Sequence, residues 1–416
     1  MKVFKFGGAS VKDAQAVKNL GTIVKHYGSN DTLIVVSAMG KTTNALEAVV
    51  NQYANGGQGL QAALQVVKQY HKQIILELFL SEAHPAMLQF ETTYKALLQF
   101  LETNTNTNYD FSYDQIIHYG ELFSTQIIGH FLNQIDLEVS WLDARNYIKT
   151  NANYRRALVD MQVTERLILP LAETGKLMVT QGFIASNAEG FTTTLGREGS
   201  DYTAAIFGAC LQAESVTIWK DVPGVLNADP RYFEAPELLE RMSYNEAIEL
   251  AFYGASVMHP KTLQPLQQKA IPLHVKSFLN PDGVGTVVHT QAGIHPQVPC
   301  YIVKKNQMLI QLSSLDFSYI VEENISDIFR LLHHFKMKVD VIQNSAITFS
   351  VCVDDLYNTL QDVVAHLQQK FKVQYTTNVA LYTVRHYNTQ AIALIESNKT
   401  ILLKQRSQDT LQIVTQ

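Results

Sequence analysis

The sequence predicts an α/β fold followed by a smaller α+β region, and three observations support this prediction. A strand pattern at residues 3–6, a helical pattern from residue 14 and an apolar run at residues 32–39 follow one another at the start of the chain. This order is typical of a parallel sheet covered by helices. Beyond about residue 300 the strands and amphipathic helices become shorter. A chain of 416 residues, 46% hydrophobic, also exceeds the size of one ordinary core, so we expect at least two domains.

The first domain is expected to begin with a strand, a turn and a helix. "SVKD" matches a capping box, with Ser10 as the N-cap and Asp13 reaching back, so the preceding glycines lie in the turn. Residues 46–142 carry long helical patterns and predict a helical insertion. Strands return at residues 176–186 and 215–222, with a helix at 201–211 that Ser200 is expected to cap. A helix at 244–253 and a strand at 271–278 complete the domain.

The boundary is expected in a turn-rich stretch. We assign residues 1–290 to the first domain, 291–299 to a linker and 300–416 to the second domain. The second domain reads as strand, helix, strand, strand, helix, strand, and then the same order begins again and stops. The second repeat is incomplete unless an earlier strand, near residues 301–303, joins it.

Composition excludes several classes of partner. The net charge of -5 provides no basic field for nucleic acid, and apolar stretches such as residues 74–80 are far shorter than the ~20 residues that span a membrane. The chain starts with the strand-like "KVFKF" and shows no leader. Its cysteines, Cys210, Cys300 and Cys352, are far apart and lack metal-ligand spacing. We therefore expect a reducing, cytoplasmic compartment, with no nucleic-acid or membrane partner.

"KFGGAS", residues 5–10, places a lysine and two glycines at the first turn. Glycines after a strand free backbone N–H groups at a helix N-terminus, where the helix dipole favours anions. Lys5 adds a positive charge beside Gly7 and Gly8. The pattern suits a phosphate cradle, although it is not the usual P-loop, and a bare strand-to-helix turn is an equally open interpretation.

A second motif, "QGFIASNAEGFTTTLGREGSDYTAA" at residues 181–205, gathers hydroxyls, a guanidinium and a carboxylate around one helix start. Arg197 can bind a carboxylate through two parallel hydrogen bonds, and Asp201 can pair with an ammonium. These groups suit an α-amino acid. The alternative is an Arg–Asp ion pair beside an ordinary helix cap.

A third motif, "IWKDVPGVLNADPR" at residues 218–231, leaves a strand and turns at once. It places Asp221, Asp229 and Arg231 at the carboxyl end of the strand, which is the ligand-binding edge of open α/β sheets. A plain hydrophilic turn built on Pro223 and Gly224 is an alternative interpretation.

These motifs, together with "VVSAMGKTTNAL", "HYGELFS" and "YGASVMHPKTL", occur in the order and spacing of the aspartate kinases, and the whole chain resembles that family. The resemblance implies a three-layer α/β/α amino acid kinase domain and two C-terminal ACT (ferredoxin-like) domains, one interleaved with the other. Interleaving would supply the strand that the second repeat lacks. The implied reaction transfers the γ-phosphoryl group of ATP to the side-chain carboxylate of L-aspartate. The product, 4-phospho-L-aspartate, leads toward lysine, threonine, methionine and diaminopimelate.

The resemblance also implies roles for individual residues. Because the accepting carboxylate has a pKa near ~4, it is ionised at pH 7, so positioning and charge stabilisation must carry catalysis. The implied catalytic groups are Lys5, Gly7, Gly8 and Asp201. The implied substrate positions are Ser37, Thr43, Glu121, Arg197 and Ser200, with Glu121 and Asp201 on the amino group and Arg197 and Ser200 on the α-carboxylate. The implied nucleotide positions are Lys5, Phe6, Gly7, Gly8, Lys220, Asp221, Leu226, Arg231, Ser256 and Val257, with Mg²⁺ carried mainly on the ATP phosphates.

Some residues depart from the family pattern. Ser256 stands where the family usually has lysine, and Leu226 where it often has tyrosine, which bears on ATP affinity. Glu198 occupies the middle of "GREGSD", where "GRGGSD" is common. Its carboxylate either lies beside the substrate's carboxylate or points to solvent.

The regulatory region departs most from the family pattern. "LDFSYIVEEN" and "QNSA" replace the usual runs there, so the effector cannot be read from the sequence, although lysine or threonine is the candidate that the resemblance implies. Asp340, Asn344 and Ser345 fit the effector positions. The resemblance also implies a homodimer through the ACT region.

Two other functions remain open. A catalytically silent amino-acid sensor would keep the fold and use the ACT domains alone. Another member of the superfamily, such as a kinase for N-acetylglutamate or a nucleoside monophosphate, would lack the aspartate-type substrate site. The presence of Lys5, Thr43, Glu121, Arg197 and Asp201 favours the active aspartate kinase.

Overall fold

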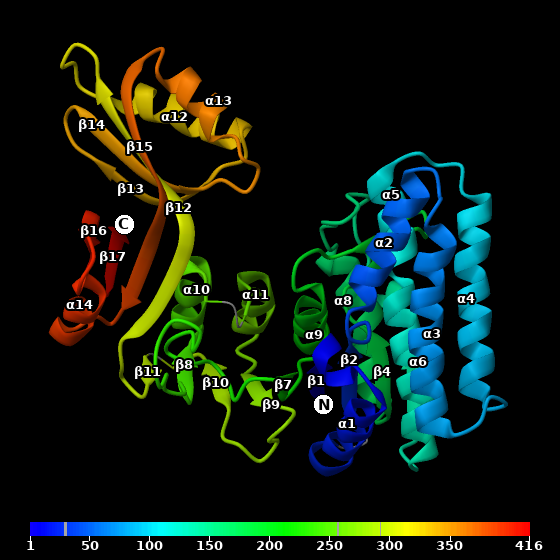
Figure 1. Ribbon diagram of the computed structural model, residues 1–416. Helices are drawn as coiled ribbons and strands as arrows, with labels where there is room; N and C mark the ends of the chain where they lie inside the picture. Colours follow the sequence, from blue (N-terminus) through cyan, green and yellow to red (C-terminus); the bar gives the residue numbers. More distant parts are fainter. Residues whose placement is uncertain (29–30, 256–257, 292) are drawn as a thin grey trace. The chain divides into compact units, whose positions relative to one another are not determined.

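The computed structural model describes residues 1–28, 31–255, 258–291 and 293–416, and in it the chain divides into two compact units (Figure 1). The first unit comprises Met1–Val225, Leu238–Ile248 and a stretch that ends at Ile294. The second comprises Leu226–Glu237, a stretch that begins at Glu249, and His295–Gln416. The first unit thus ends within the expected linker, 291–299. Two short segments of the expected kinase domain belong to the second unit.

The first unit is built on a nine-stranded sheet of order β11-β8-β10-β9-β7-β1-β2-β4-β3. Its strands are β1 (Lys2–Phe6), β2 (Thr32–Val36), β3 (Val139–Leu142), β4 (Leu177–Gln181), β7 (Ser215–Lys220), β8 (Arg241–Ser243), β9 (Leu273–Ser277), β10 (Thr286–His289) and β11 (Ile294–His295). β1 runs parallel to both of its neighbours, with Lys5 opposite Val35 of β2 and Ile218 of β7. The carboxyl ends of β1, β2, β4 and β7 therefore meet at one edge.

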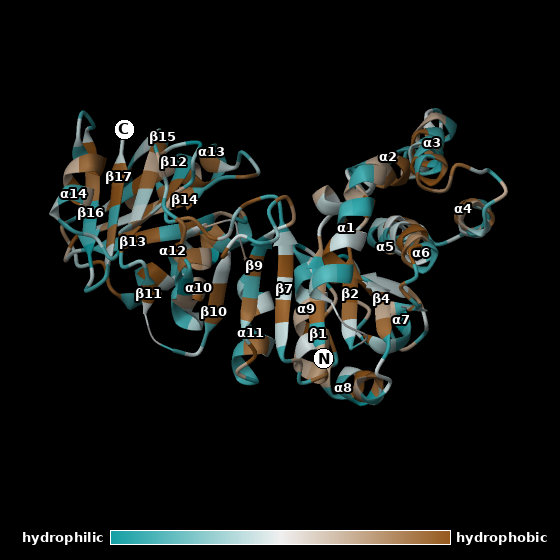
Figure 2. Cartoon of the chain, turned by 90° about the horizontal axis from the view of Figure 1, so that it is seen from below, coloured by the Kyte–Doolittle hydropathy of each residue, from teal (hydrophilic) through white to brown (hydrophobic). Residues whose placement is uncertain are grey.

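Helices cover both faces of this sheet, as Figure 2 shows for α6 on one face and α9 on the other. Their bounds are α1 (Ala14–Tyr27), α2 (Thr42–Ala54), α3 (Leu60–Phe79), α4 (Pro85–Thr103), α5 (Tyr109–Ile117), α6 (Tyr119–Gln134), α7 (Ala144–Tyr147), α8 (Met161–Ile168), α9 (Gly199–Cys210), α10 (Tyr244–Tyr253) and α11 (Pro260–Gln268). This arrangement confirms the three-layer α/β/α prediction. No helix in the described ranges is long and apolar enough to cross a membrane.

Two details of the first unit differ from the expectation. The capping box at Ser10 is wrong: a short 3₁₀ helix, Gly8–Val11, comes first, and Asp13 caps α1 by accepting from the Ala16 amide at 2.7 Å. The Ser10 hydroxyl instead donates to the Trp219 carbonyl at 3.3 Å. The expected helical insertion, 46–142, also ends in the edge strand β3, whose four residues are too few to show a strand period.

The second unit contains a six-stranded sheet of order β13-β14-β12-β15-β17-β16. Its strands and helices are β12 (Cys300–Ser314), α12 (Glu322–His334), β13 (Lys338–Asn344), β14 (Thr348–Asp354), α13 (Leu360–Leu367), β15 (Phe371–Arg385), α14 (Thr389–Glu396), β16 (Ile401–Arg406) and β17 (Thr410–Thr415). β12 pairs with β14 over Met308–Ser313, and its first residues pair with the end of β15, Tyr301 opposite Val384. The early strand expected near 301–303 is therefore the start of β12, which completes the second repeat.

Candidate active site

A cavity of about 330 Å³ lies in the first unit. Side chains and backbone from strand ends, helix starts and loops surround it. The lining residues are Lys5, Ser37, Thr43, Glu121, Phe183, Gly196, Glu198, Gly199, Ser200, Asp201 and Lys220. Predicted residues from five separate motifs thus come together in one place, because the ends of parallel strands meet at the same edge.

Asp201, in the first turn of α9, holds two lysines at the cavity. Its carboxylate lies 2.6 Å from the Lys5 ammonium and 3.4 Å from that of Lys220. Burial alone would raise the pKa of Asp201, but the two ammonium groups outweigh burial and hold it below its usual value. The aspartate is therefore ionised near neutral pH and fixes two positive charges at the ends of β1 and β7.

The glycines after β1 allow close approach of two backbone turns. A Cβ at Gly8 would lie only 2.9 Å from the carbonyl oxygens of Ala38 and Gly40. A Cβ at Gly7 would lie 3.3 Å from the Lys5 ammonium nitrogen. Phe6, by contrast, is buried in the core, where its ring stacks on Trp219, so only its backbone is available to a ligand.

Glu121, in the first turn of α6, is a buried carboxyl group at the cavity. Its Oε1 accepts from the Ala38 amide at 3.3 Å, and its Oε2 is buried without a hydrogen-bond partner in the described structure. Burial raises its pKa to about 8. A buried acceptor that lacks a donor suits a ligand cation such as an ammonium group.

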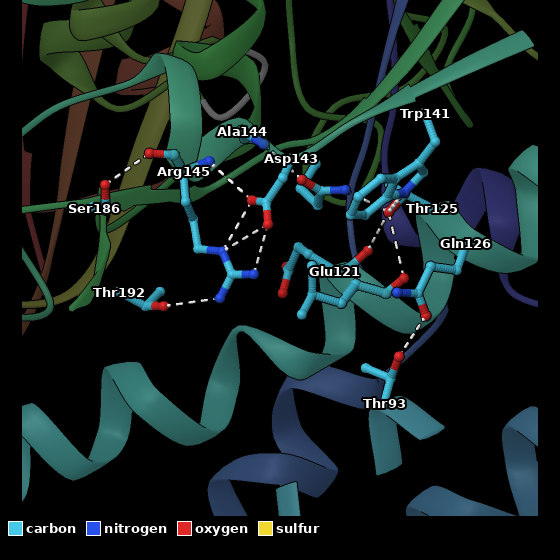
Figure 3. Close-up of polar contacts among 12 residues, drawn as sticks. Thr93, Glu121, Thr125, Gln126, Trp141, Asp143, Ala144, Arg145, Ser186 and Thr192 are labelled. Atoms are coloured by element: carbon cyan, nitrogen blue, oxygen red, sulfur yellow. Dashed lines mark hydrogen bonds and ion pairs between the residues drawn. The ribbon is translucent and has the colours of Figure 1, made fainter. Parts of the chain in front are cut away.

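A network of polar contacts holds the start of α6 in place (Figure 3). The Thr125 hydroxyl donates to the Glu121 carbonyl at 2.9 Å and accepts from Trp141 at 3.0 Å and from Gln181 at 2.8 Å. Through Gln181, the helix that carries Glu121 is fixed to the end of β4. The carboxyl group of Glu121 therefore has a rigid support.

A second set of buried contacts positions the loop before α9. Asp114 accepts from the amide and the hydroxyl of Thr194 and from the Arg155 amide, at 2.9, 2.7 and 2.9 Å. Thr194 ends the hairpin of β5 (Ile184–Ser186) and β6 (Thr192–Thr194), which leads into residues 195–198. Burial raises the pKa of Asp114 to about 6, against the effect of these hydrogen bonds.

The loop before α9 differs from the expectation in several ways. Ser200 lies inside the first turn, so its assignment as the cap is wrong, and Glu198 stands at the N-cap with φ 53°. Glu198 also does not simply point to solvent: it lines the cavity, and its Oε2 is buried. Arg197 is exposed and does not line the cavity, and Asp201 pairs with lysines in place of this arginine.

The predicted nucleotide positions Asp221, Leu226 and Arg231 do not line the cavity. Asp221 is exposed directly after β7. Leu226 and Arg231 belong to the second unit, where Arg231 forms an ion pair with Asp229 at 2.6 Å. Ser256 and Val257 lie outside the described residues.

The predicted effector positions lie at and after β13. The side chain of Asp340 is 7% exposed and pairs with Lys304 at 2.7 Å and with Lys338 at 3.5 Å, whereas Asn344 and Ser345 are exposed. The carboxylate proposed for an effector thus already has two cationic partners from its own chain.

Four lining residues were not predicted as part of the site: Phe183, Gly196, Glu198 and Gly199. Phe183 follows β4 with φ 70°, and Gly182 directly after "LMVTQ" was the signal for a ligand-facing turn at this edge. Glu198 was noticed only as a departure from a family pattern. Among the described residues, no group of three or more His, Cys, Asp or Glu could hold a metal ion.

Comparison with known proteins identifies the family of the chain. The model of the amino acid kinase family matches residues 1–277. Lysine-sensitive aspartokinase 3 of Escherichia coli (strain K12) is 32% identical over 363 residues, covering 86% of this chain and 79% of the relative. Among solved structures, E. coli aspartokinase III in complex with lysine and aspartate has a TM-score of 0.83 at 28% identity, covering 100% of this chain and 95% of that one.

The same E. coli enzyme in complex with aspartate and ADP has a TM-score of 0.80 at 27% identity and covers 100% of this chain and 96% of that one. Both structures span the kinase unit and the C-terminal sheet together. The agreement therefore extends over the whole chain, which belongs to the amino acid kinase family and, within it, to the aspartokinases.

Proposed function

We propose that the cavity of the first unit is the active site in which this aspartate kinase transfers the γ-phosphoryl group of ATP to the side-chain carboxylate of L-aspartate. The observation that carries this proposal is the arrangement of Lys5 and Lys220 on Asp201 at a cavity that Thr43 and Glu121 also line. A solved relative that binds aspartate and ADP supports it.

Catalysis rests on charge and position. The accepting carboxylate is ionised at neutral pH, so no general base is required, and its approach to the phosphates is opposed by like charge. Lys5 offsets that repulsion at the transferring phosphoryl group, and the Gly7 and Gly8 amides contact it. Asp201 keeps both lysines in place, so that no reorganisation is needed when charge develops.

The amino acid is oriented by groups around the same cavity. Glu121 accepts the ammonium group, because its buried Oε2 lacks a donor. Ser37 and Thr43 contribute hydroxyls from the turn after β2 and the first turn of α2. Arg197 and Ser200 bind the α-carboxylate; the exposed guanidinium of Arg197 turns toward the cavity when aspartate enters.

Mg²⁺ is proposed to arrive on the ATP phosphates. The ionised carboxylate of Asp201 is already engaged by two lysines, so it does not fit the role of a metal ligand. We therefore assign no step of the reaction to a metal bound by protein side chains. A reducing, cytoplasmic compartment remains our expectation for this enzyme.

Coupled ATP turnover with a panel of acceptors tests the proposal. L-Aspartate should be phosphorylated, whereas N-acetylglutamate and UMP should not. Binding of aspartate without turnover would identify a silent sensor. Turnover with another acceptor would place the chain elsewhere in the superfamily.

We further propose that two copies associate through the second unit. β13 is an edge strand of the six-stranded sheet, and Ile342 on it is 42% exposed. An unpaired edge can be extended by a second copy, and a charge on it blocks pairing. Sedimentation should show a dimer for the full chain and a monomer for Ile342→Lys. The matched control is Ile401→Lys on the opposite edge strand, β16, where the side chain is 40% exposed. A dimer in both variants would contradict this interface.

Lysine or threonine is the proposed effector class, supported by the relative that binds lysine. The existing partners of Asp340, Lys304 and Lys338, oppose the binding of a further cation there. Titration of activity with both amino acids tests the effect. Dimerisation is expected to persist even if neither inhibits.

A further inference from the structure

Glu198 stands at a backbone position that disfavours its side chain. Its φ and ψ are 53° and 27°, in the left-handed region that glycine adopts without steric cost. A glutamate retained there gives up stability that a glycine would keep. The presence of a glutamate at this backbone position therefore suggests a role for its carboxyl group.

Glu198 is part of the wall of the active-site cavity. Glu198 lines the cavity together with Lys5, Asp201 and Lys220, and its Oε2 is buried without a hydrogen-bond partner among the described residues. A buried acceptor without a donor is costly to maintain unless a ligand or a proton satisfies it. The side chain therefore has a binding role to fill.

The charges that face Glu198 come from every side of the cavity. Lys220 ends β7, Asp201 lies in α9, Arg197 precedes Glu198 and Lys5 lies in β1. Burial raises the pKa of Glu198 and the Asp201 carboxylate adds to this, whereas Lys220, Arg197 and Lys5 oppose it; the net pKa is raised. Glu121 also lines the cavity, and burial raises its pKa to about 8.

We propose that Glu198 is an internal anion that competes with the phosphate groups of the nucleotide for Lys220 and Lys5, and that it takes up a proton when those phosphates bind. This rests on the proposed function and specifies how the same site is tuned. With Asp201 ionised, a second carboxylate offsets the remaining positive charge of the lysine pair. Protonation of Glu198 removes that charge and leaves the lysines to the phosphates.

The proposal fixes the sign of the pH dependence. At low pH Glu198 is neutral and the phosphates bind tightly. As pH rises Glu198 ionises, and binding weakens because like charges then face each other. Binding in turn favours the protonated form, so the complex forms with proton uptake.

Calorimetry on the full chain tests this without measuring turnover. A non-hydrolysable ATP analogue with Mg²⁺ is titrated in two buffers of different ionisation enthalpy, which gives the number of protons taken up. The variant is Glu198→Gln, and the matched control is Glu189→Gln, a nearby exposed glutamate that does not line the cavity. Protons exchanged by the nucleotide itself are common to all three proteins and cancel in the comparison.

Glu198→Gln should bind the analogue about threefold to tenfold more tightly than the wild type at pH 8, and the difference should shrink as pH falls. The variant should also lose part of the proton uptake, whereas Glu189→Gln should match the wild type. Glu198→Gly should share the tighter binding and melt at a higher temperature, because it also removes the backbone strain.

Equal or weaker binding by Glu198→Gln at pH 8, or unchanged proton uptake, would overturn the proposal. Glu198 would then be expected to bind a cationic group of the ligand. Failure of the analogue to bind any of the proteins would instead overturn the proposed function, and this inference with it. The two failures are therefore distinguishable in one series of titrations.

Discussion

Two aspartates with buried side chains, one in each unit, have nearly the same ion-pair geometry. Asp201 pairs with lysines at 2.6 and 3.4 Å, and Asp340 pairs with lysines at 2.7 and 3.5 Å. The side chains of the two aspartates are 4% and 7% exposed. Their distances and burial therefore do not distinguish a catalytic cluster from a structural one.

The surroundings distinguish them. Lys5 and Lys220 end neighbouring parallel strands and line a cavity that also contains hydroxyls and further carboxyl groups. Lys304 and Lys338 lie within β12 and β13 of an antiparallel sheet, where their ammonium groups offset the buried charge of Asp340. A buried ion pair thus indicates function only when its cations remain available to a ligand.

Lys5→Ala should have the largest effect. It removes a positive charge directed at the charge that develops during transfer, a loss typically worth ~10²–10³ in rate. The fold should persist, because Lys220 still pairs with Asp201. Steady-state kinetics with circular dichroism would check both statements, and near-normal kcat would contradict the phosphate cradle.

Arg197→Ala should raise the KM for aspartate by about 10- to 100-fold, because a charged hydrogen-bonded contact is lost in ground and transition states alike. Stability should change little, since the side chain is exposed and has no ion pair within the described residues. If the KM for ATP rose while that for aspartate stayed constant, the assignment of Arg197 would be wrong.

Lys304→Ala is the counterpart of Lys5→Ala in the second unit and should separate the two clusters. It should lower the free energy of unfolding by about 1–3 kcal/mol, because Asp340 would keep only its longer pair with Lys338. Turnover at saturating substrate should be unchanged. Denaturant unfolding and steady-state kinetics test both statements. A large loss of kcat with normal stability would contradict the distinction between the Asp201 and Asp340 clusters.

On stability, Glu121→Gln should have the smallest effect of these variants, seen as a pH dependence of the melting temperature. Burial raises the pKa of Glu121 to about 8, so the protonated group stabilises the fold fully below its usual pKa of 4.5, and this contribution is lost as pH rises through about 8. The difference in melting temperature between the variant and the wild type should therefore shift in favour of the variant by on the order of 2–6 °C between pH 5 and 8. The exposed Glu102→Gln is the control, and parallel curves for all three proteins would argue against a protonated Glu121.

Much of the architecture could be predicted because strand ends, glycine turns and apolar periods are local signals. They predicted both sheets, residues of the cavity at the ends of β1 and β7, and the strand shared by the two repeats. The cap at Ser10 failed because its hydroxyl has a partner in β7, more than 200 residues away, which no local pattern reveals. The strand β3 was not predicted, because its four residues are too few to show a strand period.

The candidate site was predicted by residue type but not by pairing. The pattern suggested Asp201 for a ligand ammonium or for Arg197, whereas its partners are Lys5 and Lys220, which lie on separate strands. Glu198 lines the cavity from a left-handed backbone position, which a glutamate does not signal in sequence. Exposure of Arg197 likewise follows from the loop's geometry.

The 15-residue strand β12 has a consequence for how the C-terminal sheet folds. The first half of β12 pairs within the repeat that ends the chain, and its second half pairs within the repeat that β12 begins. Neither repeat can therefore be removed without cutting this strand. Cys300–Ser314 must wait for Phe371–Arg385, about 70 residues downstream, before either repeat gains its central pairing. Such non-local contacts slow folding. The whole sheet should therefore form late in folding, and the amides of both repeats should gain protection from hydrogen exchange in a single cooperative step.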